Sequence, residues 1–171
     1  MKKVLLATLL FVGVAATSFA QDGGKFSIGV EAGLPVGEIS DTHSFAIGGS
    51  LKYDLPIASD LAFTASAGYT SFQGKTSTIQ YGASSITAKW PAFGYIPVKA
   101  GIKYNLASAL YAEAQVGAAI GTESGSKTAF VYAPGLGFKF SDAVDLGVRY
   151  EGWSANGGTI SQIAARLGFS F

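Results

Sequence analysis

The last ten residues, QIAARLGFSF (162–171), decide how the rest of the sequence is interpreted. Every second residue from Ile163 to Phe171 falls on one face, and that face is apolar throughout. The other face carries Gln162, Arg166 and small residues. A period of two predicts a β-strand. A half-buried strand of a soluble protein has the same period, so the rest of the chain must show what each face meets.

The first twenty residues, MKKVLLATLLFVGVAATSFA, predict a secretory signal peptide (residues 1–20). Lys2 and Lys3 precede an uncharged apolar run, and small residues around Ala20 form a cleavage site. We expect cleavage after Ala20, which leaves a domain over residues 21–171. An uncleaved membrane anchor is the alternative, although the apolar run is short for one. A lipoprotein is excluded because no cysteine lies near the site.

Composition narrows the class of protein. Loss of residues 1–20 leaves ten basic and eleven acidic residues, a net charge of −1, so no nucleic-acid partner is indicated. The absence of cysteine excludes a disulfide scaffold and thiolate metal sites. Only 13% of residues are charged, yet the mature sequence has no apolar run of about eighteen residues, so helical membrane spans are not expected. The chain is therefore a soluble all-β domain or a membrane barrel.

Eight alternating segments follow one another along the mature sequence. They cover residues 25–34, 44–55, 60–72, 95–106, 110–121, 130–140, 144–153 and 160–171. The charged residues within them all fall on the face opposite the apolar one: Glu31, Lys52, Asp54, Lys99, Lys103, Glu113, Lys139, Asp145, Arg149, Glu151 and Arg166. A soluble barrel would carry many more charges on its exterior. The polar face, with glycine, alanine and serine, suits a narrow interior, so we expect the apolar face to meet lipid.

The connections alternate in length. Short ones at 56–59, 107–109 and 141–143 alternate with long ones at 35–42, 73–89, 121–127 and 154–159. Short turns at one end and long loops at the other are typical of outer-membrane barrels, with the turns periplasmic and the loops outside the cell. The sequence therefore predicts an all-β fold, an eight-stranded antiparallel up-and-down transmembrane β-barrel. Both termini would be periplasmic.

Two further features concern single residues. Aromatic residues gather toward both ends of the predicted strands, which is typical of the girdles at the membrane interfaces; they are Tyr53, Tyr104, Phe138, Phe140, Phe169 and Phe171 near the turns, and Phe45, Tyr69, Phe130, Tyr132, Tyr150 and Trp153 near the loops. Trp153 breaks the apolar alternation. Pro97 and Pro134 lie inside strands, where a missing donor predicts a bulge or an early end of pairing.

With these features the chain resembles the small eight-stranded outer-membrane β-barrel proteins of Gram-negative bacteria. Such families end on an aromatic residue preceded by alternating apolar residues, which is the signal read by the barrel assembly machinery. The C-terminus of this chain resembles that signal at Leu167, Phe169 and Phe171. The resemblance implies location in the outer membrane, contact with outer-membrane lipids including lipopolysaccharide, and a monomer. Independently of the resemblance, all backbone groups must be paired in hydrocarbon, so residues 25–34 and 160–171 should be neighbours.

The predicted interior holds six cationic and five anionic side chains, which together form the lumen charge network. An eight-stranded barrel leaves a space that side chains just fill, and near-balanced charges there favour mutual ion pairs. We therefore expect a plugged lumen and a structural or surface-interaction role. The alternative is a narrow ion or small-solute pore, with these charges as its selectivity lining.

Enzymatic function is not expected. The one histidine, His43, directly precedes Ser44, and neighbours in a strand point to opposite faces. Some barrels of the resembling class modify lipid A with His and Ser, which remains a lesser alternative, but a solvated loop position is expected for His43. No cofactor or metal site is indicated. The longest loop, 73–89, could form a hairpin above the membrane and bind an extracellular ligand.

Overall fold

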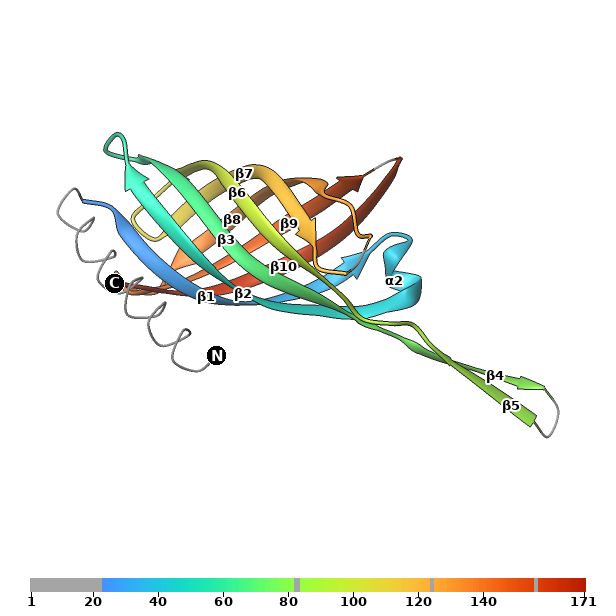
Figure 1. The fold of residues 1–171 in the computed structure, drawn as a ribbon. Coiled ribbons are helices and arrows are strands. Elements are labelled where there is room, and N and C mark those ends of the chain that lie inside the picture. Colours follow the sequence, from blue (N-terminus) through green and yellow to red (C-terminus); the bar gives the residue numbers. More distant parts are fainter. Residues whose placement is uncertain (1–22, 82–83, 124, 156) are drawn as a thin grey trace, which may run out of the picture.

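A computed structural model describes residues 23–81, 84–123, 125–155 and 157–171, so the predicted signal peptide lies outside the described part. Within that part, eight strands form a closed antiparallel barrel in the order β1-β10-β9-β8-β7-β6-β3-β2 (Figure 1). The barrel strands are β1 (Lys25–Val36), β2 (His43–Pro56), β3 (Leu61–Gly74), β6 (Phe93–Asn105), β7 (Leu110–Gly121), β8 (Ala129–Lys139), β9 (Val144–Ala155) and β10 (Gly158–Ser170). The predicted fold class is confirmed, and the strand boundaries differ from the predicted ones by a few residues at most.

The barrel closes between its first and last strands, as backbone pairing in lipid requires. Ser27 pairs with Ser170 at one end of this seam and Val36 pairs with Ser161 at the other. Beyond β10, the amide of Phe171 still donates to the carbonyl of Phe26 at 2.9 Å. The predicted adjacency of the two terminal segments is confirmed.

Three short connections at one end of the barrel, called the turn end here, share one hydrogen-bond pattern. The amides of Ile57, Leu106 and Phe140 each donate to a carbonyl four residues later, at 2.9 Å in every case. This end also holds both ends of the described chain, at β1 and β10 (Figure 1). Three tight turns at this end are what the sequence predicts.

The opposite end, the loop end, contains two structured connections. The helix α2 (Ile39–Thr42) lies between β1 and β2. Strands β4 (Thr76–Tyr81) and β5 (Ser84–Lys89) lie between β3 and β6 and form a separate two-stranded hairpin. This hairpin projects far beyond the barrel, on the side away from the chain ends (Figure 1). Among the described residues, no helix is both long and apolar enough to cross a membrane.

The expectation of a long loop at residues 154–159 is wrong. Strands β9 and β10 stay paired up to Ala155 and Gly158, so their connection is tight. Gly157 has a φ of 89°, which glycine adopts without strain. The dipeptide Asn156-Gly157 favours a two-residue hairpin, and this signal outweighs the polar composition of the segment.

The two strand prolines are accommodated without the bulges that we expect from the sequence. Pro97 pairs with Ala119 of β7, and Pro134 pairs with Ala114 of β7. On its other side, Pro97 faces β3, and Pro134 likewise faces β9. In each of these two ladders, two successive residue pairs around the proline are missing, and pairing then resumes in the same register. A missing donor thus interrupts one ladder locally while the neighbouring ladder continues. The register shift recorded for β2 and β3 lies elsewhere, between His43 and Phe45.

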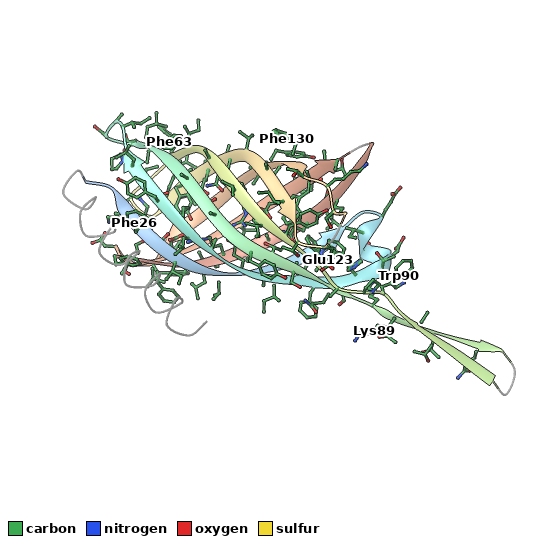
Figure 2. The ribbon with its side chains drawn as sticks, viewed as in Figure 1. Phe26, Phe63, Lys89, Trp90, Glu123 and Phe130 are labelled. Atoms are coloured by element: carbon green, nitrogen blue, oxygen red, sulfur yellow. The ribbon has the colours of Figure 1, made fainter. Side chains whose placement is uncertain are left out.

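The apolar alternation places large side chains on the outer wall. Val30, for example, is 62% exposed on the barrel surface. Figure 2 shows Phe63 and Phe130 on this wall, near opposite ends of the barrel, and both are exposed. The expected girdle position of Trp153 is wrong, because this side chain points inward and is 2% exposed. The position of Trp153 outside the apolar alternation of its strand therefore indicates that its side chain faces inward.

Candidate functional site: the barrel lumen

The half of the lumen nearer the turn end contains a neutral group of four charged residues. Lys103 Nζ donates to Asp54 Oδ2 at 2.8 Å, and Lys52 Nζ donates to Glu113 Oε2 at 2.9 Å. Lys52 also lies 3.7 Å from Asp54 and so joins the two pairs. These residues come from β2, β6 and β7; β6 and β7 are paired neighbours, whereas β2 meets them only through the interior of the barrel. Two cations therefore balance two carboxylates at this level.

A second group of five residues lies farther toward the loop end. Arg149 lies between two carboxylates: its Nη2 is 2.6 Å from Glu31 Oε2 and its Nε is 3.0 Å from Glu151 Oε1. Lys99 pairs with the same oxygen of Glu151. Arg166 lies 3.8 Å from the other oxygen of Glu31. Three cations thus share two carboxylates among buried side chains, where unpaired charges are costly.

Neutral hydrogen-bonding groups complete the environment of this second group. Arg166 donates to the hydroxyls of Ser50 at 2.9 Å and Ser27 at 3.0 Å. Ser50 in turn donates to Glu31 at 2.5 Å, and Gln162 donates to Glu151 at 2.7 Å. The hydroxyl oxygens of Ser27 and Ser50 therefore stabilise the Arg166 guanidinium, whereas the Gln162 amide stabilises the Glu151 carboxylate. Among the described residues, Arg166 Nη1 has no hydrogen-bond partner.

Two members of the predicted network lie outside both groups. The carboxylate of Asp145 accepts a hydrogen bond from the Tyr111 hydroxyl at 2.7 Å. Lys139, near the turn end, donates to Asn105 Oδ1 at 2.7 Å. Nine of the eleven predicted residues thus meet an opposite charge within the described part of the chain, and these two meet neutral partners instead.

Glycines on the inner face make room for the bulky lumen side chains. A Cβ atom on Gly29 would lie 2.5 Å from the guanidinium carbon of Arg166. A Cβ atom on Gly137 would lie 2.0 Å from the ring of Tyr111. The aromatic ring and the guanidinium therefore lie directly over the backbone of the neighbouring, hydrogen-bonded strand. Glycine in these strands is required by close approach rather than by backbone conformation.

The loop end of the lumen is apolar and aromatic, which we do not predict from the sequence. Phe72 and Phe93 stack at 5.0 Å between ring centroids, and Trp153 meets Phe72 edge to face at 5.3 Å. Tyr95 in turn meets Trp153 at 5.1 Å. Buried Ala46, Ala119, Ala129 and Val131 surround these four rings, which we call the aromatic cluster. The signal was present, because Phe72, Phe93 and Tyr95 occupy inward positions of their strands.

His43 is buried under this cluster, so the expectation of a solvated loop residue is wrong. It begins β2 and is 6% exposed, with its ring 4.7 Å from that of Phe93. Nδ1 lies 2.8 Å from Thr42 Oγ1, and Nε2 lies 3.2 Å from the carbonyl oxygen of Pro91. Ser44 donates to the carbonyl of Gln73. His43 therefore connects the end of α2 to the segment that follows the hairpin.

Cavities show where space remains. A space of about 230 Å³ opens at the turn end, with Lys25, Lys103 and Lys139 among its lining residues. Between the two charged groups, a cavity of about 20 Å³ is large enough for a single water molecule. The described residues contain no group of three acidic, histidine or cysteine side chains that could hold a metal ion.

Comparison with known proteins gives one family and several similar folds. The model of the family "Outer membrane protein beta-barrel domain" matches residues 4–171. No curated protein sequence matches the chain. Ail, the attachment invasion locus protein of Yersinia pestis, is similar in structure, with a TM-score of 0.58, 18% identity, and coverage of 86% of this chain and 97% of Ail.

Two further solved structures have the same fold. The N-terminal β-barrel domain of Pseudomonas aeruginosa OprF gives a TM-score of 0.56 at 13% identity, covering 86% of this chain and 97% of that domain. A transmembrane β-barrel designed de novo gives 0.55 at 12% identity, covering 86% and 95%. At these identities the likeness shows the architecture alone.

Proposed function

The chain belongs to the outer membrane protein beta-barrel domain family, and on that premise we propose that it is a closed outer-membrane anchor that displays the β4–β5 hairpin outside the cell. The hairpin is the observation that carries this proposal. It reaches beyond the barrel at the end opposite the short turns, which is the extracellular end in barrels of this kind (Figure 1).

The foot of the hairpin is fastened to the barrel. Lys75, between β3 and β4, donates its amide to the carbonyl of Thr42 at 2.7 Å and its ammonium group to the carbonyl of Ser40 at 2.5 Å. The amide of Trp90 donates to the carbonyl of Lys75 at 3.0 Å. Figure 2 shows Lys89 and Trp90 at this foot. The arms therefore start from a fixed direction, which favours presentation to a partner.

The two arms expose their outer backbone edges. Strands β4 and β5 pair with each other and with no other strand of the described chain. Proteins usually protect such edges with charge, proline or a bulge. Between Lys75 and Lys89 the arms carry no charge and no proline, and threonine, serine and isoleucine predominate. We therefore propose that the partner is an extended polypeptide segment that adds to one of these edges.

Cross-linking in intact cells tests this role. A photoreactive residue at Thr78 or Gln80, both exposed on β4, should give adducts with polypeptide partners. The same residue at Ala58, in a turn at the other end, is the matched control. Equal labelling from Thr78 and Ala58, or no labelling from Thr78 and Gln80, would contradict the proposal.

The closed state of the lumen is a proposal that the paired charges and the aromatic cluster support. The alternative, a narrow pore, predicts steady single-channel openings in planar bilayers. In that case neutralising Lys99 or Arg149 would shift the ion preference. We expect no sustained openings from the folded protein. Lipid A modification that is lost on His43→Ala would instead support the enzymatic alternative, although both ring nitrogens of His43 already face protein oxygens.

Contacts with lipids and with the assembly machinery are also proposals. The exposed rings of Phe45 and Tyr69 on the outer wall would lie among acyl chains. The ammonium groups of Lys75 and Lys89, nearer the hairpin, would lie near lipopolysaccharide phosphates. Phe171, at the turn end beside β1, would be accessible to the machinery that inserts the barrel. A monomer is the proposed state in the membrane.

A further inference from the structure

A cavity of about 380 Å³ lies at the loop end, beside α2 and the tip of the β9–β10 hairpin. It is distinct from the β4–β5 hairpin, and neither arm of that hairpin contributes to its wall. Its volume lies within the range of small-molecule sites, about 300–1,000 Å³. Because it opens at the loop end, molecules outside the cell can reach it without crossing the barrel.

The wall of this cavity is largely apolar and held by strands. Tyr95, Ala129 and Trp153 come from β6, β8 and β9, and Ile39 and Ile160 complete the wall from α2 and β10. The Tyr95 and Trp153 rings are fixed edge to face at 83° as part of the aromatic cluster. Trp153 and Ala129 are buried behind this wall, whereas Tyr95, Ile39 and Ile160 are partly exposed. Their apolar surface gains free energy when an apolar body covers it.

One charged residue contributes to the wall. Glu38, which immediately precedes α2, lies at the exposed edge of the cavity. Within the described part of the chain, no cationic side chain lies within ion-pair distance of it. The neighbouring Asp41 is also exposed and adds negative charge to the same connection. The chemistry of the edge is therefore anionic, while that of the interior is aromatic.

From this combination we infer that the cavity is a binding site for a small organic cation whose apolar or aromatic body fills the space and whose ammonium group faces Glu38. Aromatic faces attract cations as well as apolar groups, so both ends of such a molecule find complementary chemistry. An anionic molecule of the same shape would be repelled at the edge. This inference goes beyond the proposed anchoring role and does not depend on the hairpin.

The test uses the full-length processed protein in phospholipid nanodiscs, because detergent could itself fill the cavity. Trp90→Phe leaves Trp153 as the single tryptophan, so its fluorescence reports on the cavity wall. The probes are phenylethylammonium, neutral 2-phenylethanol and anionic 3-phenylpropanoate, with empty nanodiscs as the blank. We expect a saturable fluorescence change with the cation, a weaker response to the alcohol, and the weakest to the anion.

Two variants separate cavity binding from partition into lipid. Ala155→Phe introduces a ring into the wall and should abolish the saturable change. Glu38→Gln, at an exposed position, should weaken the cation about two- to fivefold and leave the alcohol unchanged. Ala58→Phe, at the turn end, is the control for an added ring. If Ala155→Phe fails to insert into the membrane, Glu38→Gln still provides a decisive comparison.

Three results would overturn the inference. The first is the absence of a saturable response to phenylethylammonium. The second is equal affinity for all three probes, or an unchanged cation affinity in Glu38→Gln, which would remove the role of charge. The third is an unchanged response in correctly folded Ala155→Phe, which would place the bound probe outside this cavity.

Discussion

Arg149 and Glu31 meet inside the barrel at 2.6 Å although 118 residues separate them in the sequence. They belong to β9 and β1, which are not neighbours, since β10 lies between them. Their side chains therefore connect β9 to β1 across β10, through the lumen. Backbone pairing closes the barrel at its wall, and this ion pair connects the same region from within.

Glu31→Gln should destabilise the barrel by about 3 kcal/mol, the lower end of the range for breaking a buried ion pair. The loss is at the lower end because Glu151 still neutralises Arg149. Denaturant unfolding in lipid vesicles measures this free energy. The double variant Glu31→Gln/Arg149→Met should be less destabilised than the sum of the two single variants.

Glu123→Gln is the matched control for this substitution, because Glu123 is exposed in a connection at the loop end (Figure 2). Its effect should stay within about 0.5 kcal/mol. Strict additivity of Glu31→Gln and Arg149→Met would mean that the two side chains do not stabilise each other.

Gly137→Ala should destabilise the barrel by about 1–3 kcal/mol, the usual cost of overpacking. The added methyl group would displace the Tyr111 ring and disturb its hydrogen bond to Asp145. Gly49→Ala is the control, because its Cβ atom would meet only ordinary contact at 3.4 Å. Unfolding midpoints of the two variants give the comparison, and equal midpoints would contradict close packing at Gly137.

Val30→Arg should cost about 2–4 kcal/mol, since Val30 lies midway along β1 on the outer wall and a charge there meets the centre of the bilayer. Leu106→Arg, in a turn and equally open to the surroundings, should cost about 0–1 kcal/mol. Refolding into vesicles measures both. A reversed order would mean that the outer wall does not face hydrocarbon at Val30.

Phe171→Ala should reduce the amount of folded barrel in cells several-fold and change its refolding in vitro little. The side chain is 71% exposed, so its loss removes little packing, and the backbone hydrogen bond to Phe26 remains. Comparing heat-modifiable protein in cell membranes with the refolded yield in vesicles separates these effects. A loss of equal size in both would indicate a structural role for the ring instead.

The fold could be predicted because its rule is local. In a barrel the face of each residue follows from its parity along the strand, and the sequence keeps that parity from Phe26 to Phe171 with few exceptions. The short turns and the neighbouring terminal strands follow from the same alternation and from the need to pair every backbone group in lipid. The exact first and last residues of the strands were predicted less accurately, because fraying and turn geometry determine them.

The interior could be predicted only in part. Parity shows that Arg149 and Glu31 point inward, but which of the inward charges pair depends on strand stagger and side-chain reach. For the same reason the sequence did not separate Lys139 and Asp145 from the rest. The aromatic cluster was not predicted as a unit because Phe93 lies outside the predicted strand 95–106, although parity placed Phe72 and Tyr95 inside. His43 was misplaced because its burial depends on α2, a single short turn that directly precedes it, and on the hairpin foot at Pro91, which is distant in sequence.

The seam between β1 and β10 joins residues such as Ser27 and Ser170, which lie near opposite ends of the described chain. Such pairing has the highest contact order that a chain of this length allows, so it forms late and slowly. Until β10 has been made, β1 has no partner on one side and cannot enter hydrocarbon alone. The barrel therefore cannot close in a membrane before the whole sequence of strands, through β10, is complete.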